Sequence, residues 1–340
     1  MTVSGSESDV PVLSVRDLRT HFPMGGGLLS RLTGKRRVAH ALDGVTLDIR
    51  PGETLAVIGE SGSGKSTLGR TVLRLQEPTS GTVSFRGDEL TRLRREELRR
   101  KRRHMQMIFQ NPYSSVNRRN RLRDIIAEPM HVHGIGSAES RGERAIELLE
   151  LVGLNSDFAR RYPHEVSGGQ LQRVGIARAL ATEPEFLVAD EPTASLDVSV
   201  RANTMNLLHD LKQQLGLTLM FISHDLAVVS YVADRIAVLY LGRIVEIGTK
   251  EEVERAPQHP YTQALLSAAP SPDPRRRGKA SAPLGEAPNA IDRPSGCHYH
   301  PRCPLAVPVC REKYPVLERK VNGQQVACHA VPSADAASPA

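Results

Sequence analysis

The chain contains no tryptophan, and aromatic residues make up only 4% of its 340 residues. Binding of nucleic acid by stacking bases on aromatic side chains is therefore poorly supported. No run of 18 apolar residues occurs, so the sequence predicts no membrane-spanning helix. Residues 1–10 are polar and acidic, unlike a signal peptide. We therefore expect a cytosolic location.

Cysteine is absent from the first 296 residues, yet four cysteines follow within a 32-residue stretch. The four are Cys297, Cys303, Cys310 and Cys328. Core packing gives no reason to confine one residue type to one short segment. The clustering therefore points to a shared role for the thiols.

Positive charge is in excess, since 45 Lys and Arg residues face 38 Asp and Glu residues. A net charge of +7 permits a nucleic acid, an anionic membrane surface or a nucleotide as partner, but selects none of them. Residues 92–103 hold eight basic residues in twelve positions. We interpret this run as a solvated helix face, because Glu96 and Glu97 interrupt it and can pair with it. The alternative is a patch that binds nucleic acid or anionic lipid.

Short apolar runs alternate with helical patterns along the chain, which predicts an α/β core. Helices are expected over residues 65–75 and over most of residues 111–180. A hairpin is expected to turn at residues 241–242. The expected strands are residues 12–15, 45–49, 54–58, 83–85, 105–109, 186–189, 219–222, 235–239 and 243–247.

The segment after the expected strand 54–58 reads Gly-Glu-Ser-Gly-Ser-Gly-Lys-Ser over residues 59–66. This pattern, between a strand and a helix, is typical of a phosphate-binding loop. Its glycines let successive backbone N–H groups face one anion, while Lys65 can reach the β- and γ-phosphates and Ser66 can hold Mg²⁺. A Gly/Ser-rich turn without function is the alternative, but it does not need Lys and Ser at fixed places. The residues predicted to bind ATP here are Gly59, Glu60, Ser61, Gly62, Ser63, Gly64, Lys65, Ser66 and Thr67.

Five further polar elements follow the phosphate loop in a fixed order. They are Gln110 at the end of an apolar strand, the run Ser167, Gly168, Gly169 and Gln170 at a helix start, Asp190 with Glu191 after a strand, Ser195-Leu196-Asp197, and His224 with Asp225 after the next strand. Ser167 is well placed as a helix N-cap. Taken singly, Glu191 and His224 could each be an ordinary polar residue at a strand end.

In this order, the six motifs resemble those of the ATPase subunit of an ATP-binding-cassette (ABC) transporter, over about residues 12–270. The resemblance implies a P-loop NTPase cassette, with a RecA-like α/β core, an antiparallel β subdomain and a helical subdomain at about residues 111–180. The chain would then comprise a nucleotide-binding domain over residues 1–270, a Pro-rich linker over 271–296 and a small Cys-rich C-terminal extension over 297–340. The linker is placed by composition, since eight prolines fall between residues 270 and 304.

The resemblance also implies a role for each motif in ATP hydrolysis. Asp190 would hold Mg²⁺ through water, together with Ser66 and Gln110. Glu191 would orient and polarise the attacking water, with His224 at the γ-phosphate and Gln110 beside the water as further catalytic residues. Asp197 belongs to the nucleotide-binding set.

The run from Ser167 to Gln170 lies about a hundred residues after the only phosphate loop, and in the family it serves the nucleotide held by the opposing subunit. The resemblance thus implies a head-to-tail dimer of two cassettes with two ATP molecules in the interface. Val166 stands where the family commonly has Leu, a conservative departure. For adenine, Phe22 is the best-placed stacking residue, with His40 behind it. A core role for Phe22 is the alternative.

The stretch from Met107 to Asn117 resembles the Gln-containing loop of dipeptide and oligopeptide importers, with Val116 and Arg118 departing from their usual Leu and Pro. Residues 126–130 and 259–266 and the Cys-bearing end fit the same subfamily. The resemblance implies a peripheral subunit at the cytoplasmic face of the membrane, with two permease subunits and an extracellular peptide-binding protein as partners. Importers of nickel, glutathione or other solutes, and a phosphonate-metabolism component, share these features. A nucleic-acid-acting ABC ATPase is disfavoured by the single cassette and the lack of heptads.

The cysteine cluster leaves three interpretations open. A [4Fe–4S] cluster needs four thiolates, and this segment supplies four with none left over. Zn²⁺ also accepts four thiolates, but zinc sites usually contain close Cys pairs, which are absent here. The third interpretation is no metal, while disulfides are disfavoured in a cytosolic chain. His298, His300 or His329 could replace a ligand. Some members of the peptide-importer family carry such a cluster, which favours iron–sulfur.

Overall fold

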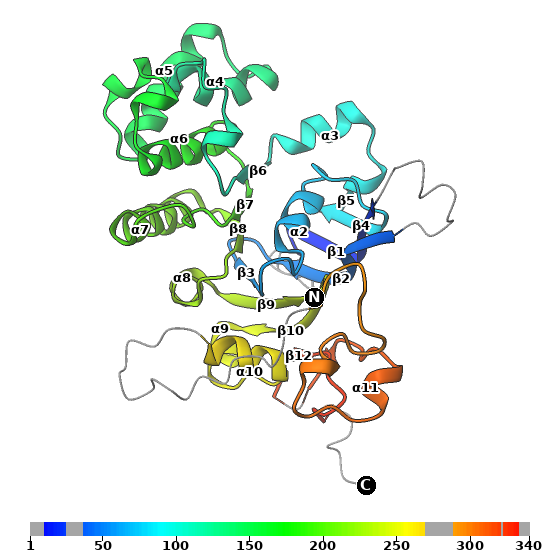
Figure 1. Ribbon diagram of the computed structural model, residues 1–340. Coiled ribbons are helices and arrows are strands. Elements are labelled where there is room, and N and C mark those ends of the chain that lie inside the picture. The colour runs from blue at the N-terminus through cyan, green and yellow to red at the C-terminus, as the bar shows by residue number, and fades with distance from the viewer. Residues whose placement is uncertain (1–9, 25–36, 269–287, 321, 333–340) are drawn as a thin grey trace, which may run out of the picture. The chain divides into compact units, whose positions relative to one another are not determined.

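The computed structural model describes residues 10–24, 37–268, 288–320 and 322–332 (Figure 1). The chain divides into two compact units. The first unit comprises residues 1–12, 49–54 and 86–222, and the second comprises residues 13–48, 55–85 and 223–340. Within the described ranges, no helix has the length and apolar character needed to cross a membrane.

One sheet of the second unit has the strand order β2-β1-β4. These are β1 (Leu13–Met24), β2 (Arg37–Ile49) and β4 (Ser80–Phe85). β1 runs antiparallel to β4, with Leu13 opposite Phe85 and Val15 opposite Val83. β1 and β2 are longer than the sequence predicts, because their outer halves are only half-buried and carry polar residues that hide the alternating pattern. This is the predicted antiparallel β subdomain.

The other strands of the second unit follow the order β11-β12-β10-β9-β3. β3 (Thr54–Ile58) is buried along its whole length and pairs in parallel with β9 (Arg235–Tyr240). β9 turns into the antiparallel β10 (Arg243–Thr249), so the predicted hairpin is present. Beyond it, β12 (Gln325–Val326) pairs with β10, and β11 (Glu318–Arg319) pairs with β12.

The C-terminal segment thereby extends the sheet that begins at β3. Its side chains also enter the core, since Tyr299 is buried with Ile58, Tyr240 and Tyr261 in one apolar cluster, against which Cys297 and Cys303 pack. The helices of this unit are α2 (Lys65–Val72), α8 (Leu226–Val232), α9 (Lys250–Arg255), α10 (Pro260–Ser267), α11 (Val309–Glu312) and the 3₁₀ turn η7 (His300–Arg302).

The first unit holds three parallel strands in the order β8-β7-β6. They are β6 (Met105–Ile108), β7 (Phe186–Asp190) and β8 (Thr218–Ile222). β7 and β8 are buried at every position, so they read as continuous apolar runs, as parallel strands do.

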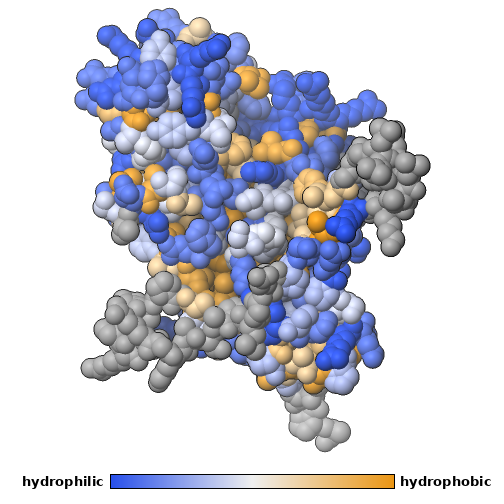
Figure 2. Space-filling model, viewed as in Figure 1, coloured by the Kyte–Doolittle hydropathy of each residue, from blue (hydrophilic) through white to orange (hydrophobic). Residues whose placement is uncertain are grey.

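Three helices of this unit pack on one another and form a helical group, drawn in green at the top of Figure 1. They are α4 (Leu122–Val132), α5 (Ala138–Leu151) and α6 (Gly168–Leu180), and their outer surface is mostly hydrophilic in Figure 2. The other elements are α3 (Arg95–Arg102), α7 (Val198–Leu215), β5 (Asp88–Glu89), η2 (Leu90–Arg92), η3 (Tyr113–Ser115), η4 (Ser156–Arg160) and η5 (Pro163–Glu165).

Two local features differ from the sequence-based expectation. The helix expected over residues 65–75 ends at Val72, because Arg74 takes a left-handed backbone conformation with φ 54°. β6 ends at Ile108, so Gln110 follows the strand by two residues instead of ending it. Most of the predicted Pro-rich linker, residues 271–296, lies outside the described residues. Its boundaries and those of the predicted domains therefore stay predictions.

The burial of Tyr299 makes the docking of the C-terminal segment testable. Its side chain is 2% exposed and lies 5.4 Å, centroid to centroid, from both Tyr240 and Tyr261. We expect Tyr299→Ala to lower the free energy of unfolding by about 3 kcal/mol, because truncating a buried aromatic residue leaves a cavity. Tyr231→Ala is the matched control, since Tyr231 is 52% exposed. Denaturant unfolding measures both, and equal losses in the two variants would contradict the docking.

Candidate functional site

The predicted phosphate loop lies between β3 and α2 in the second unit. All three of its glycines have backbone conformations that L-residues rarely adopt: φ is 153° at Gly59, 77° at Gly62 and 105° at Gly64. A Cβ added at Gly59 would lie 2.2 Å from the carbonyl oxygen of Leu239, and one added at Gly64 would lie 2.3 Å from that of Ala41. Neither position can therefore accept a side chain, and the glycines let the loop close against its neighbours.

Lys65 opens α2 and turns its side chain back into the loop. Its ammonium donates to the carbonyl oxygens of Gly59 at 2.7 Å and Glu60 at 2.9 Å. The residue is only 6% exposed, so its charge is held inside the loop. Ser66 and Thr67 follow in the first turn of α2, both half-buried. A cation and the N-terminus of a helix thus meet at one point, which favours an anion there.

In the first unit, the structure brings Gln110 and Glu191 together. The Gln110 side-chain amide donates to the Glu191 carboxylate at 2.6 Å, although 81 positions separate the two residues. Asp190 closes β7 and is 1% exposed. The Glu191 backbone is left-handed, with φ 46°, a conformation that costs a non-glycine residue about 1–3 kcal/mol. Its N–H donates to the Ile222 carbonyl at 2.9 Å, which holds the turn in place.

The run from Ser167 to Gln170 begins α6 as the sequence predicts. The Ser167 hydroxyl accepts the N–H of Gln170 at 3.3 Å, and the Gln170 side chain accepts the N–H of Ser167 at 3.0 Å. This reciprocal pair is a capping box, and it fixes the start of the helix. A Cβ added at Gly169 would lie 2.5 Å from a methyl group of Val200, so the glycine lets α6 and α7 approach closely.

Arg178 of α6 ties the Gln-containing loop to that helix. Its guanidinium donates to the carbonyl of Ser115 and lies 5.8 Å above the ring of Phe109. Burial lowers the pKa of Arg178, and the charge of Glu128 opposes this effect. From the other side, the Tyr113 hydroxyl donates to the Val166 carbonyl at 3.4 Å, next to Ser167. A displacement of the loop would therefore be felt at the start of α6.

The remaining predicted site residues lie at element ends or on a strand. Asp197 precedes α7 as its N-cap, is exposed, and accepts the Arg201 N–H only through its backbone carbonyl. His224 follows β8 and is exposed, and Asp225 caps α8 with its carboxylate. Phe22 is half-buried near the end of β1. The imidazole of His40 hydrogen-bonds to His21, a neighbour of Phe22 in the chain.

The four cysteines come together in the second unit. The Cys297 N–H donates to the Cys310 carbonyl at 2.8 Å, and Cys328 follows β12, which pairs with β10 of the same unit. Burial raises the pKa of the Cys297 thiol to about 11, and repulsion from the other three thiols adds to this effect. Burial likewise raises the pKa of Cys303 and Cys328, again with repulsion from neighbouring cysteines.

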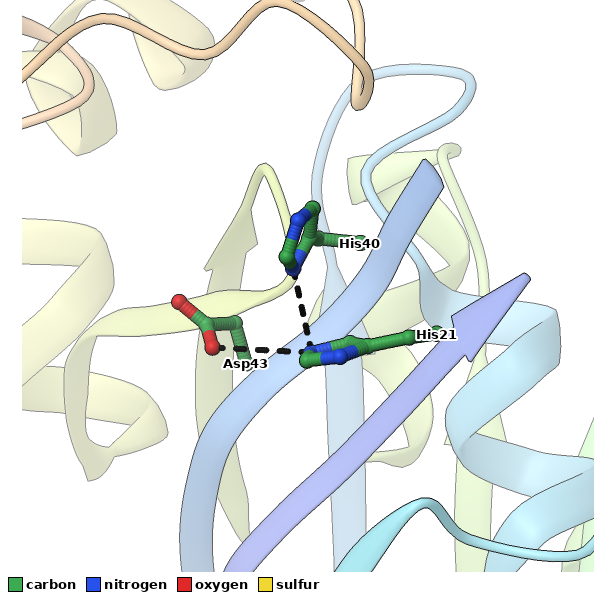
Figure 3. Close-up of side chains that lie close together, drawn as sticks. All are labelled: His21, His40 and Asp43. Atoms are coloured by element: carbon green, nitrogen blue, oxygen red, sulfur yellow. Dashed lines mark hydrogen bonds and ion pairs between the residues drawn. The ribbon is translucent and has the colours of Figure 1, made fainter. Parts of the chain in front are cut away.

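A second group of potential metal ligands is His21, His40 and Asp43 (Figure 3). His40 Nδ1 lies 3.1 Å from His21 Nε2, which is 3.7 Å from Asp43 Oδ1. The other Asp43 oxygen accepts hydrogen bonds from Arg243 at 2.6 Å and Arg293 at 2.8 Å. Burial would raise the pKa of Asp43, but these two guanidinium groups hold it well below its usual range. Two fixed cations beside the carboxylate oppose a metal ion, so we interpret the group as an anchor for residues 290–293.

Two residues that contact the phosphate loop are not singled out by sequence reasoning. The Tyr261 hydroxyl accepts the N–H of Glu60 at 2.8 Å, and Arg302 binds the Glu60 carboxylate through two nitrogens. Tyr261 lies in the stretch that resembles peptide importers, which was the only available signal for it. Nothing in the sequence signals Arg302, because 242 positions separate it from Glu60.

Comparison with known proteins matches the architecture just described. Residues 42–194 match the family described as ABC transporter, and residues 245–310 match the family described as oligopeptide/dipeptide transporter, C-terminal region. A putative peptide import ATP-binding protein of Brucella ovis is 49% identical over 94% of this chain and 98% of its own. The oligopeptide transport ATP-binding protein AppF of Bacillus subtilis is 45% identical over 97% of this chain and 99% of its own.

Solved structures give the same class. The ATP-binding cassette MJ0796, dimeric in a post-hydrolysis state with ADP and Pi, is 31% identical, with a TM-score of 0.62 over 70% of this chain and 98% of its own. CbiO1 from Clostridium perfringens, part of an ABC transporter complex, is 28% identical, with a TM-score of 0.60 over 72% of this chain and 90% of its own. The predicted P-loop NTPase cassette fold is thereby confirmed, and its class is that of the ATP-binding-cassette ATPases.

Within that class, the chain belongs to the family of ATP-binding subunits of oligopeptide and dipeptide ABC transporters. The resemblance drawn from the six ordered motifs is confirmed.

Proposed function

We propose that this chain hydrolyses ATP to power the import of dipeptides or oligopeptides through a membrane ABC transporter. The observation that carries the proposal is the buried Lys65 ammonium, held at the N-terminus of α2 by the carbonyl groups of a glycine-shaped loop. The names of relatives that align with nearly the whole chain support peptides as the transported solute.

In this proposal the phosphate loop, residues 59–67, binds the triphosphate. Lys65 contacts the β- and γ-phosphates, and the loop N–H groups and the helix dipole add to the binding. Mg²⁺, which neutralises the charge that develops on the phosphates, is held by Ser66, Gln110 and, through water, Asp190. Phe22 stacks on adenine.

Glu191 orients and polarises the attacking water. The hydrogen bond from Gln110 supports this role, because it holds the carboxylate in one orientation. The strained left-handed backbone supports it as well, since such conformations gather at functional sites. His224 completes the catalytic set at the γ-phosphate.

The run from Ser167 to Gln170, together with Asp197, serves the nucleotide of an opposing cassette. Two cassettes, identical or homologous, would form a head-to-tail dimer with two ATP molecules in the interface. The capped, Gly-rich start of α6 supports this assignment, because such a helix end favours an anion and lies on the exposed surface. The dimeric state of the MJ0796 cassette supports it too.

The membrane partners are two permease subunits, and an extracellular peptide-binding protein acts through them. The chain then works as a peripheral subunit at the cytoplasmic face of the cell membrane, with no nucleic acid involved. Two contacts of the Gln-containing loop support a route from nucleotide to permease. Arg178 in the last turn of α6 binds the Ser115 carbonyl, and Tyr113 binds the Val166 carbonyl beside the start of that helix.

We further propose that Cys297, Cys303, Cys310 and Cys328 hold a [4Fe–4S] cluster that fastens the C-terminal segment. The described residues contain one group of three or more potential ligands within 4.8 Å, and it includes none of the four thiols. What supports the proposal is the donor set itself. Four cysteines with none left over match the four thiolates that a [4Fe–4S] cluster would take, and the close Cys pairs usual in zinc sites are absent.

Reconstitution tests the transported solute. We expect the chain, placed in vesicles with its native permeases, to hydrolyse ATP faster when a peptide-loaded binding protein is present. Peptide uptake should rise in parallel with hydrolysis. Stimulation by nickel-loaded or glutathione-loaded binding protein in place of peptide would contradict the peptide assignment.

Glu191→Gln tests the catalytic carboxylate. We expect ATP binding to be kept and turnover to fall on the order of 10²-fold or more, because the water loses its general base. Glu150→Gln is the matched control, since Glu150 is exposed at the end of α5. Single-turnover hydrolysis by the intact transporter measures the effect. Near-normal turnover in Glu191→Gln would exclude the assignment.

Ser167→Arg tests the composite site. The arginine would place charge and bulk where the γ-phosphate of the opposing subunit docks, so we expect hydrolysis to stop while ATP binding at Lys65 remains. Ser137→Arg is the control, because Ser137 also caps a helix start with its side chain, at about the same cost of ~1 kcal/mol. Equal hydrolysis by the two variants would contradict the dimer.

Metal analysis of anaerobically purified protein tests the cysteine cluster. We expect about four iron and four sulfide per chain and a brown colour. Cys303→Ser should remove the cluster and speed amide exchange in residues 297–328, because the ligand bonds tie that segment together. Since burial raises the pKa of the thiols, cluster loss should increase as the pH falls and protons compete for the sulfurs. One zinc without sulfide would replace the cluster by zinc, and no metal would reject both.

A further inference from the structure

Glu60 is the second residue of the phosphate loop, and all three of its polar groups are engaged. Its N–H donates to the Tyr261 hydroxyl at 2.8 Å. Its carbonyl accepts from the Lys65 ammonium at 2.9 Å and from the Ser63 N–H at 3.2 Å. Its carboxylate accepts from Arg302. The position of Glu60 therefore bears directly on the position of Lys65.

Arg302 grips the Glu60 carboxylate with two parallel hydrogen bonds, 3.0 and 3.1 Å long. Its side chain is 7% exposed, and the Tyr240 hydroxyl accepts a further hydrogen bond at 3.4 Å. Burial would lower the pKa of Arg302, but the hydrogen bonds to Glu60 and Tyr240 outweigh this effect and raise it. The arginine is therefore charged at every relevant pH, in the fork geometry that suits a carboxylate.

The C-terminal segment holds Arg302 on a short turn between two of the cysteines. The His300 N–H donates to the Cys297 carbonyl, the Arg302 N–H to the Tyr299 carbonyl and the Cys303 N–H to the His300 carbonyl. Tyr299 is buried in the core beside Tyr240 and Tyr261. These hydrogen bonds and the burial of Tyr299 fix the backbone of the turn from which the Arg302 side chain reaches the phosphate loop.

The position of Tyr261, the other contact of Glu60, depends on the buried carboxylate of Glu246. Glu246 of β10 accepts the N–H groups of Gln258 at 2.8 Å and His259 at 3.0 Å, and His259 caps α10 by accepting the Tyr261 N–H at 3.0 Å. Burial raises the pKa of Glu246, opposed by these hydrogen bonds. Burial lowers the pKa of His259 to about 3, so its imidazole is neutral and free to accept.

Glu60 carries a negative charge within a loop that is proposed to bind a negatively charged triphosphate. A carboxylate in a loop that binds a triphosphate repels the ligand unless a cation neutralises it. The loop unit supplies that cation from 242 positions away, on the C-terminal segment. In the part of the chain that the structure describes, Arg302 forms an ion pair with Glu60, with 3.0 Å between nitrogen and oxygen.

We propose that Arg302 is a positioning residue of the nucleotide site: it neutralises Glu60 and fixes the phosphate loop, so that the Cys-bearing C-terminal segment completes the ATP site. This rests on the proposed function, since it takes the loop as the ATP site. The consequence is that the state of the C-terminal segment acts on ATP affinity through one ion pair.

The experiment measures Mg-ATP affinity of the full-length chain by calorimetry. We expect Arg302→Gln to weaken binding on the order of tenfold, because it leaves one uncompensated negative charge in the loop. Glu60→Gln alone removes the negative charge and leaves the positive charge of Arg302 beside the triphosphate, so it should bind ATP more tightly than the parent chain. The double variant should regain most of the affinity that Arg302→Gln loses. Arg302→Lys keeps the charge and should stay within about threefold of the parent, a difference of less than 1 kcal/mol.

Recovery of ATP affinity in the double variant shows that Arg302 acts by compensating the charge of Glu60. If Arg302 had only a structural role, Glu60→Gln would not restore the affinity that Arg302→Gln loses. Arg311→Gln removes an exposed charge from the same segment and is the matched control. If Arg302→Gln fails to fold, Glu60→Gln and Arg302→Lys still decide. Weaker binding by Glu60→Gln would overturn the proposal, as would a loss in Arg302→Gln that the double variant does not restore.

The variant Lys65→Ala distinguishes a failure of the proposed role of Arg302 from a failure of the proposed ATP site. Loss of ATP binding in Lys65→Ala, with unchanged binding in Arg302→Gln, would contradict the role of Arg302 alone. Unchanged ATP binding in Lys65→Ala would contradict the proposed function and the role of Arg302 together.

Discussion

The close packing of the phosphate loop is the constraint on which the rest of the second unit depends. Gly59 and Gly64 bring the loop backbone so near to Leu239 and Ala41 that no side chain fits there. Leu239 lies on β9 and Ala41 lies on β2, so these two strands must hold fixed positions. β9 is held by its pairing with β3 and with β10, which in turn pairs with β12 of the C-terminal segment. The order of strands in this sheet is thus a scaffold for one loop.

In the first unit, the corresponding constraint is the turn that follows β7. This strand ends in Asp190, and the chain then turns sharply at Glu191 with a backbone conformation that carries strain. The turn is retained because the Glu191 N–H is bound to Ile222 and its carboxylate to Gln110. Both contacts fix the direction of the carboxylate before any ligand arrives. Such preorganisation suits the proposed activation of water by Glu191, because no binding energy is then spent on ordering the carboxylate.

The sequence predicted those features whose causes are local. The loop pattern, the cap at Ser167, the hairpin at residues 241–242 and the continuous apolar strands β7 and β8 each follow from a few neighbouring residues. The outer halves of β1 and β2 were missed, because polar residues on half-buried strands carry little periodic signal. The grip of Arg302 on Glu60 and the aromatic cluster of Tyr240, Tyr261 and Tyr299 depend on contacts between distant segments. No pattern within one stretch of sequence reveals them.

Amide hydrogen exchange of the full-length chain, with and without Mg-ATP, tests the central claim most directly. The account holds that residues 59–66 cradle the triphosphate with their backbone N–H groups. It therefore predicts that Mg-ATP slows exchange most strongly in this loop and in the first turn of α2, and that Lys65→Ala abolishes the effect. Protection that appears elsewhere in the chain while residues 59–66 exchange at an unchanged rate would contradict it.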